Sequence, residues 1–257
     1  MICSTSAARQ KVVSYAIGIV AILALLPASA IAASQRTFVA SYGSDASPNC
    51  ALLAPCRSFN AAIAQTSGGG EVVILDTAGY GPMVISKSIK VIGPAGVYGG
   101  ISVIGGANPT TGIIINAGDT DDVILRGLDI TGVPGSAPLP LIGIDIQNAG
   151  AVYIEKSSIS NFPEDGGACI QLVTAKSVRV FVDDSFLRHC LTGIHANGTA
   201  ISSNRSGVYL DNTRIERGFN SNPASTAVGL WMQGFMVYNN INAPGPVFIT
   251  PLVIPLK

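Results

Sequence analysis

Short apolar strands alternate with polar turns down the middle of the chain, and the arrangement repeats. In each copy a first strand is followed by a second strand, a two-residue polar turn and a third strand. The first strands of four copies begin at Gly112, Gly143, Cys169 and Gly193, so the copies are spaced by 31, 26 and 24 residues. One copy cannot bury its apolar side alone, whereas stacked copies share a core. The pattern therefore predicts a coiled parallel sheet.

The alternation within the first strands indicates which side chains face outward. If Ile144 and Ile146 point into the core, the residues between and after them point to the surface. The outward positions of the first strands then carry Asp145, Gln147, Gln171, His195 and Asn197. These side chains are polar and form a column that could hydrogen-bond to sugar hydroxyls. A plain solvated sheet face is the alternative interpretation of the same column.

The second strands and the turns that follow them carry their own signals. The same alternation stacks Tyr153, Phe181 and Tyr209 on the outer surface, where an aromatic ladder that stabilises the sheet is the simpler interpretation and sugar binding the alternative. The turns after the second strands are Arg126-Gly127, Glu155-Lys156, Asp183-Asp184 and Asp211-Asn212. Gly, Asn and Asp tolerate the left-handed backbone that tight turns need, and Lys156 is the exception.

Residues 1–33 are interpreted as a signal peptide. Arg9 and Lys11 precede a nearly continuous apolar run over residues 12–26, and small residues at Ala28, Ala30 and Ala32 suit a signal peptidase. An uncleaved anchor is the alternative. No later stretch is long and apolar enough to span a bilayer. We therefore expect an exported protein, periplasmic or extracellular, with no membrane span after cleavage.

Residues 34–70 are expected to cap the first coil. A strand is predicted over Thr37–Ala40 and a short helix over Arg57–Gln65, with Ser58 as its N-cap and Gly68–Gly70 ending it. The first strand of the first coil is expected at Glu71–Leu75, and Gly100–Val103 is expected to open the next coil. Residues 233–257 are interpreted as a C-terminal cap or tail, because Pro246, Pro251 and Pro255 exclude a central strand there.

Charge and cysteine content narrow the class of protein. Without Arg9 and Lys11 the chain has 13 basic and 15 acidic residues, a net charge of −2, so nothing indicates a nucleic-acid partner. Cys50 and Cys56 bracket a short loop and are predicted to form a disulfide in an exported chain. For Cys169 and Cys190, two buried free thiols are the simpler interpretation and a second disulfide the alternative. No Cys or His spacing suggests a metal site.

The N-terminal segment carries a family resemblance. Thr37–Gly43, Pro55–Phe59 with the helix after it, and Gly79–Gly81 leading into Ile85–Ile89 resemble exported bacterial right-handed parallel β-helix proteins of the pectin-lyase-like superfamily. The resemblance covers roughly residues 37–232. It implies an all-β, single-stranded right-handed parallel β-helix of about six to seven coils over residues 71–232, behind a short capping helix. Lyases, glycosidases and proteins without a known reaction share that fold, so activity does not follow from it.

In enzymes of that superfamily the sugar chain lies along the outer face of the first strands. The resemblance therefore implies a groove along Asp145, Gln171 and His195, with Gln147, Asn197 and Trp231 as further binding residues. A glycosidase needs two carboxylates, and the catalytic candidates are Asp145 with Glu164, Asp165 and His195. A lyase would need Ca²⁺ on Asp145, Glu164 and Asp165, with Lys176 or Arg179 as base. Asp183 and Asp184 are assigned to turn chemistry.

Three functions remain open from the sequence. The first is a non-catalytic solenoid that binds carbohydrate or another surface partner, and the missing carboxylate cluster favours it. The second is a polysaccharide lyase or glycoside hydrolase that uses the groove. The third is a structural protein or a degenerate relative of an enzyme. A polysaccharide or a cell-surface glycan is the expected partner, and no cofactor or metal is expected, with Ca²⁺ required only by a lyase.

Overall fold

The computed structural model describes the chain over residues 33–104, 110–133, 135, 137–198, 207–216, 228–233, 236–239, 247–248 and 252–255. From residue 228 onward the description covers the backbone alone. The predicted signal peptide lies outside the described residues, except for Ala33. Residues 33–257 form one compact unit, and no helix in the described part is long and apolar enough to cross a membrane.

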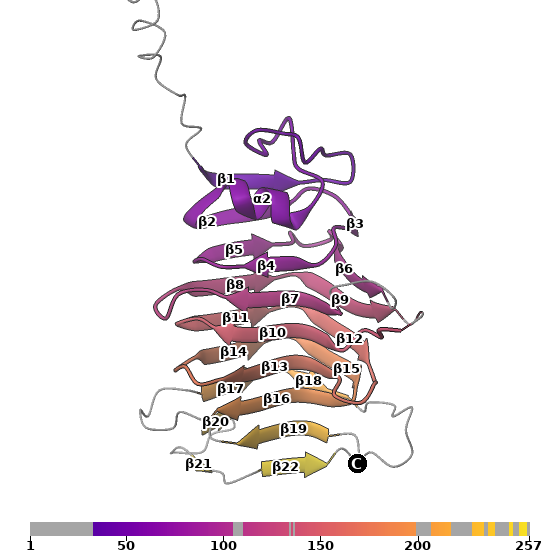
Figure 1. Cartoon of the computed structure of the whole chain (residues 1–257), viewed down its shortest axis with the longest axis vertical. Helices are drawn as coiled ribbons and strands as arrows, with labels where there is room; N and C mark the ends of the chain where they lie inside the picture. Colours follow the sequence, from indigo (N-terminus) through magenta and orange to yellow (C-terminus); the bar gives the residue numbers. More distant parts are fainter. Residues whose placement is uncertain are drawn as a thin grey trace, which may run out of the picture. The chain divides into compact units, whose positions relative to one another are not determined.

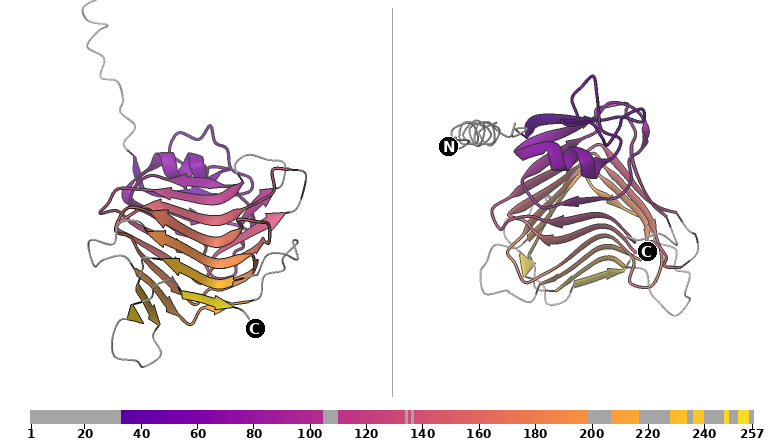
Figure 2. Two further views of the ribbon diagram at one scale, coloured as in Figure 1. Left: turned by 60° about the horizontal axis from the view of Figure 1, so that its bottom comes forward. Right: turned by 45° about the horizontal axis from the view of Figure 1, so that its top comes forward.

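The unit is an all-β parallel solenoid of about six turns, built from three sheets (Figures 1 and 2). Sheet I contains β4 (Met83–Ile85), β7 (Thr111–Asn116), β10 (Ile142–Asn148), β13 (Ala168–Thr174), β16 (Thr192–Gly198), β19 (Val228–Gln233) and β22 (Leu252–Pro255). Sheet II contains β1 (Ser34–Val39), β2 (Thr66–Ile74), β5 (Ile89–Ile92), β8 (Asp122–Arg126), β11 (Ala151–Glu155), β14 (Arg179–Asp183), β17 (Gly207–Asp211), β20 (Met236–Asn239) and β21 (Val247–Phe248). Sheet III contains β3 (Ala78–Gly79), β6 (Gly99–Ile104), β9 (Leu128–Val133), β12 (Ser158–Phe162), β15 (Phe186–Cys190) and β18 (Arg214–Ile215).

One coil of the solenoid is a strand of sheet I, then one of sheet II, then one of sheet III. Each strand pairs in parallel with the equivalent strand of the next coil, as β10 does with β13 and β13 with β16. The predicted coiled parallel sheet is therefore confirmed, while its right-handed winding stays a prediction. At the C-terminal end β22 and β21 pair antiparallel with β19 and β20 and form the sheet edges.

Aliphatic side chains stacked at equal positions of successive coils form the core. In sheet I one such stack is Ile113, Ile144, Ile170 and Ile194, and each of the four is fully buried. Valine takes the same role in sheet II, at positions 123, 152, 180 and 208. Branched side chains suit strands and pack well against their neighbours above and below. This continuous core is what the sequence repeat encodes.

The short helix α2 (Phe59–Gln65) packs at the first coil, as the sequence predicts. The Ser58 hydroxyl accepts the Ala61 N–H at 3.3 Å, and Phe59, Ala62 and Ile63 are buried. The helix ends at Gln65, as predicted, but Gly68–Gly70 are not what ends it. Thr66 is already extended at φ −84° and ψ 137° and begins β2, so Gly68–Gly70 lie within a strand. A β-branched residue at position 66 favours the extended backbone before the glycines are reached.

The predicted order of strands in the first coils also needs correction. Glu71–Leu75 was expected as a first strand, but β2 belongs to sheet II and pairs with β5. Gly100–Val103 was expected to open a coil, but β6 belongs to sheet III and pairs with β9. The connection between β5 and β6 is six residues long, from Gly93 to Tyr98, whereas the turn between β8 and β9 is the single residue Gly127. Because the connection is longer than the turns between sheets II and III in later coils, the sequence suggests that a new coil begins at β6.

A column of hydroxyl groups fixes the turns between sheets II and III. Ser157, Ser185 and Thr213 each donate to the carbonyl oxygen two residues earlier, at 2.9, 2.8 and 2.9 Å. The Ser185 hydroxyl also accepts the N–H of Ser157, at 3.2 Å, so it joins one coil to the next. The residues at the turn tips have the predicted left-handed backbone, with φ of 68° at Gly127 and 49° at Lys156.

The described part of the chain contains two disulfides. Cys50 and Cys56 are joined in the loop before α2, as predicted, with their Cα atoms 4.8 Å apart. Cys169 in β13 is joined to Cys190 in β15, with a Cα separation of 5.5 Å. The interpretation of the second pair as free thiols is therefore wrong. The parallel register brings sheets I and III together within one coil, and sequence spacing alone does not supply that distance.

Replacing Ser185 should destabilise the solenoid. Ser185→Ala removes a buried hydroxyl and leaves the N–H of Ser157 without its acceptor, which costs about 1–3 kcal/mol of unfolding free energy. Urea unfolding followed by circular dichroism measures the loss. Ser102→Ala is the matched control, because Ser102 lies on the outer face of sheet III, half-exposed, and it should change the midpoint little. Equal midpoints for the two variants would contradict the role of the hydroxyl column.

Candidate functional site: the outer face of sheet I

The outer face of sheet I carries Asp145, Gln147, Gln171, His195 and Asn197 on β10, β13 and β16. The parallel register places Asp145 beside Gln171 and Gln171 beside His195. The same line continues to the backbone of Trp231 in β19. Toward the N-terminus it continues to Ile114 and Val84, so the line is apolar in the first coils. Its polar part begins at Asp145.

The carboxylate of Asp145 is held by two amide groups. Gln147 on the same strand donates through Nε2 to Oδ2 at 2.8 Å. Gln171 on the next coil donates through Nε2 to Oδ1 at 3.3 Å. Each oxygen of the carboxylate therefore accepts one hydrogen bond and keeps lone-pair capacity for another donor. The arrangement fixes the carboxylate on the face and leaves it able to accept a hydrogen bond from a ligand.

His195 lies next to Gln171 and is half-buried. Burial lowers the pKa of its imidazole below the ordinary value of 6.5, because the cation loses hydration. The ring is therefore neutral at pH 7, with one nitrogen as donor and the other as acceptor. A neutral imidazole suits hydrogen bonding to a hydroxyl group better than binding to an anion.

A second outward line lies two residues further along the same strands. Asn197 pairs with Val173 of the preceding coil, and one coil earlier the register of Ile146 with Leu172 puts the exposed Gln147 on the same line. Val173 is 47% exposed and separates the two amides. The predicted polar column is therefore continuous along Asp145, Gln171 and His195 only, and the second line is interrupted.

The other catalytic and metal candidates lie elsewhere in the coil. Glu164, half-buried, and Asp165, exposed, occupy the connection from β12 in sheet III to β13 in sheet I. Lys176 follows β13 and pairs with Asp119 at 3.0 Å, and Arg179 begins β14 in sheet II. Among the residues that the structure describes, no three His, Cys, Asp or Glu side chains gather to hold a metal ion.

The aromatic stack on sheet II has the geometry of a structural ladder. The ring centroids of Tyr153 and Phe181 lie 4.8 Å apart with 7° between the planes, and those of Phe181 and Tyr209 lie 4.5 Å apart at 12°. The rings therefore cover one another's faces. A sugar stacks on a ring face, and the face between two stacked rings is not accessible. The ladder stabilises the pairing of three coils, which supports the structural interpretation.

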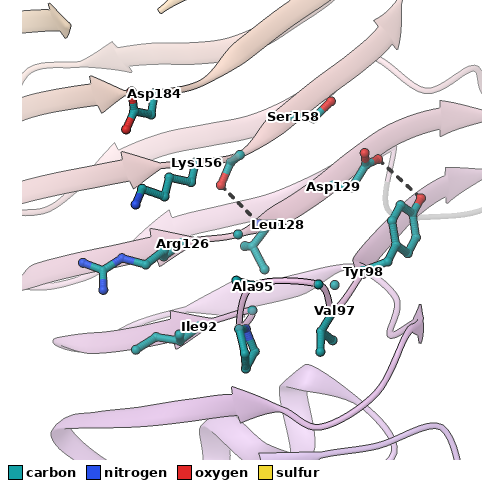
Figure 3. Close-up of a pocket in the computed structure, with 16 residues that line it drawn as sticks. Ile92, Ala95, Val97, Tyr98, Arg126, Leu128, Asp129, Lys156, Ser158 and Asp184 are labelled. Atoms are coloured by element: carbon teal, nitrogen blue, oxygen red, sulfur yellow. Dashed lines mark hydrogen bonds between the residues drawn. The ribbon is translucent and has the colours of Figure 1, made fainter. Parts of the chain in front are cut away.

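A hollow of about 680 Å³ lies at the turns between sheets II and III, where the sequence assigned only turn chemistry. Arg126, Lys156 and Asp184 lie along one side of it, and Tyr98 and Asp129 along the other (Figure 3). Sequence reasoning missed this site. The available signals were the long connection between β5 and β6 and the lysine at a turn tip that favours Gly or Asn.

Comparisons with protein-family models, with curated proteins and with solved structures find no match to this chain. The resemblance to the pectin-lyase-like superfamily therefore stays a prediction. The assignment of function rests on the geometry of the two surfaces described above.

The lowered pKa of His195 predicts how stability depends on pH. The unfolded chain takes up a proton at this residue near pH 6.5, and the folded protein does so only at lower pH, so this contribution to stability is present above pH 6.5 and is lost as the pH falls. We expect the melting temperature of the wild type to fall relative to that of His195→Gln between pH 8 and pH 5. A constant difference between the two proteins over this range would contradict the burial of the imidazole.

Proposed function

We propose that this protein is an exported, non-catalytic carbohydrate-binding solenoid. Its ligand is a polysaccharide or a cell-surface glycan that lies along the outer face of sheet I. The parallel solenoid supports this proposal because it repeats one outward position at every coil. Two disulfides are compatible with an oxidising compartment outside the cytoplasm.

The observation that carries the proposal is the carboxylate of Asp145 between two amides. Sugar hydroxyls donate and accept hydrogen bonds, and a fixed carboxylate with free lone pairs accepts well from them. Gln171 and the neutral His195 continue the line with groups that both donate and accept. The outer face of sheet I therefore offers both hydrogen-bond donors and hydrogen-bond acceptors to a sugar, and it carries no net positive charge.

The spacing of the line fits an extended chain of sugars. Successive outward residues of neighbouring strands lie about 4.8 Å apart, so Asp145, Gln171 and His195 span about two sugar units. The ligand would run across the strands, along the axis of the coil stack. The exposed apolar side chain of Val84 and the neighbouring Ile114 continue the line and offer contact for the less polar face of a sugar ring.

The scarcity of carboxylates on this face favours binding over hydrolysis. A glycosidase places two carboxyl groups about 5–9.5 Å apart. Asp145 is the one carboxylate among the outward side chains of β7, β10, β13 and β16 in the described residues. A hydrolase or lyase in the same groove would have to draw its second group from a loop, such as that of Glu164 and Asp165.

A glycan screen on the unmodified protein and on Gln171→Ala/His195→Ala tests the proposal. Removing two hydrogen-bonding groups and the support of Asp145 should weaken binding about tenfold or more, with little change in melting temperature because both positions lie on the outer face. Lys90→Ala, on the outer face of sheet II, is the control and should bind as the unmodified protein does.

Two results would count against the proposal. One is the absence of binding to any polysaccharide. The other is an equal loss of binding in Lys90→Ala. Chromatography of the glycan after incubation decides the catalytic alternative: the proposal expects chains of unchanged length, whereas shortened chains would establish a hydrolase or lyase.

A further inference from the structure

The hollow at the turns between sheets II and III arises from a difference in connection length. The β5–β6 connection, Gly93–Tyr98, has six residues, whereas a single residue, Gly127, joins β8 to β9 in the next coil. The extra residues fold into a turn in which the N–H of Val97 donates to the carbonyl of Pro94 at 3.0 Å, and Gly96 takes a φ of +85°. We call this connection, Gly93–Tyr98, the ledge; together with the tight turns of the following coils it lines the hollow.

The ledge is anchored by two glycines in close contact. The N–H of Gly93 donates to the carbonyl of Arg126 at 2.8 Å. A Cβ on Gly127 would lie 2.3 Å from the Gly93 carbonyl oxygen, so position 127 accepts no side chain. The turn tip next to the ledge, Gly127, therefore has no side chain. The first turn tip after it that carries a side chain is Lys156, one coil further on.

Lys156 occupies a position that its residue type does not favour. Its φ is 49°, in the left-handed region, where the other coils have Gly127, Asp184 and Asn212. A lysine has neither the missing Cβ of glycine nor the short polar side chain of Asp and Asn, so it is strained there. The Lys156 ammonium makes no hydrogen bond or ion pair within the described part of the chain. Arg126, in contrast, is neutralised by Glu155 at 2.6 Å.

The opposite side of the hollow offers hydroxyl and carboxyl groups. The Tyr98 hydroxyl donates to Asp129 Oδ1 at 3.4 Å, and Ser158 lies beside Asp129 on the next coil (Figure 3). Burial raises the pKa of the Asp129 carboxyl above its usual value. One side of the hollow therefore carries the unpaired ammonium of Lys156 together with Asp184, whose carboxylate accepts a hydrogen bond from Asn212, and the other side carries groups suited to hydroxyls. Its volume lies in the range of about 300–1,000 Å³ that is typical of ligand sites.

We propose that this hollow binds an acidic saccharide, with Lys156 on the sugar carboxylate and Asp129, Ser158 and Tyr98 on the sugar hydroxyls. An ammonium group binds a carboxylate as a point charge, and hydroxyl and carboxyl groups opposite it select a polyhydroxylated ligand over a simple anion. The strained backbone of Lys156 is retained because the side chain serves the ligand. The proposal extends the carbohydrate-binding function to a second site, on a different side of the coil from the outer face of sheet I.

Titration of glucuronate and glucose, followed by ligand-detected NMR, tests the proposal. These two sugars differ only at C6, which is a carboxylate in glucuronate and a hydroxymethyl group in glucose, so the unmodified protein should bind glucuronate at least fivefold more tightly than glucose. Lys156→Asn should abolish that preference. The same variant should melt at a higher temperature, because Asn suits the left-handed backbone. Lys90→Asn removes an equal charge from an exposed strand position outside the hollow and should preserve the preference.

The outcomes separate this site from the outer face of sheet I. In Gln171→Ala the preference for glucuronate over glucose should persist, because the line of Asp145, Gln171 and the neutral His195 carries no cation that would select a carboxylate. Loss in Gln171→Ala but not in Lys156→Asn would place the sugar on sheet I and overturn the inference, while the proposed function would stand. An equal effect of Lys156→Asn and Lys90→Asn would show nonspecific charge attraction and would also overturn it. So would equal affinity for the two sugars, or no binding of either by the unmodified protein.

Discussion

The stacking of aliphatic side chains between neighbouring coils is the interaction on which the rest of the molecule depends. A coil contacts only the coils before and after it, so no distant part of the chain supports it. The side chains of Ile113, Ile144, Ile170 and Ile194 are fully buried. Replacing one of them by alanine would lower the free energy of unfolding by about 2–5 kcal/mol. Backbone hydrogen bonds between parallel strands fix the register of these stacks. A shift by one residue would turn every core side chain outward.

The same register determines what the surface presents. Because Ile144 and Ile170 face inward side by side, Asp145 and Gln171 must face outward side by side and close enough to bond. The aromatic ladder on sheet II and the hydroxyl column at the turns have the same origin. A solenoid therefore makes lines of side chains rather than isolated groups. The hollow beneath the ledge is the place where a longer connection breaks this regularity.

The repeat predicted the regular part of the structure well. The outward positions, the aromatic stack and the left-handed turn tips all follow from alternation and from turn chemistry. The predictions fail where the repeat is irregular. β6 was placed in the wrong sheet because the β5–β6 connection is long, and Gly68–Gly70 were read as a helix end although Thr66 already starts the strand. The Cys169–Cys190 pair depends on a distance between sheets, which the spacing of two cysteines does not contain.

The candidate sites also have a part that the repeat predicts and a part that it does not. Asp145, Gln171 and His195 could be aligned from sequence, because they occupy equal positions in successive strands. Their hydrogen bonds could not, since they depend on side-chain conformation. The hollow escaped notice because its walls come from a connection and from turns that lie about 30 residues apart along the chain. The long connection between β5 and β6 and a lysine at a turn tip that favours Gly or Asn were the signals of it in the sequence.

Backbone amide NOEs in the perdeuterated protein test the parallel register of the coils. This register predicts contacts between strands of neighbouring coils, linking β10 to β13 around Asp145 and Gln171, and β13 to β16 around Gln171 and His195. Contacts confined to strands adjacent in the sequence, in the antiparallel pattern of hairpins, would contradict it.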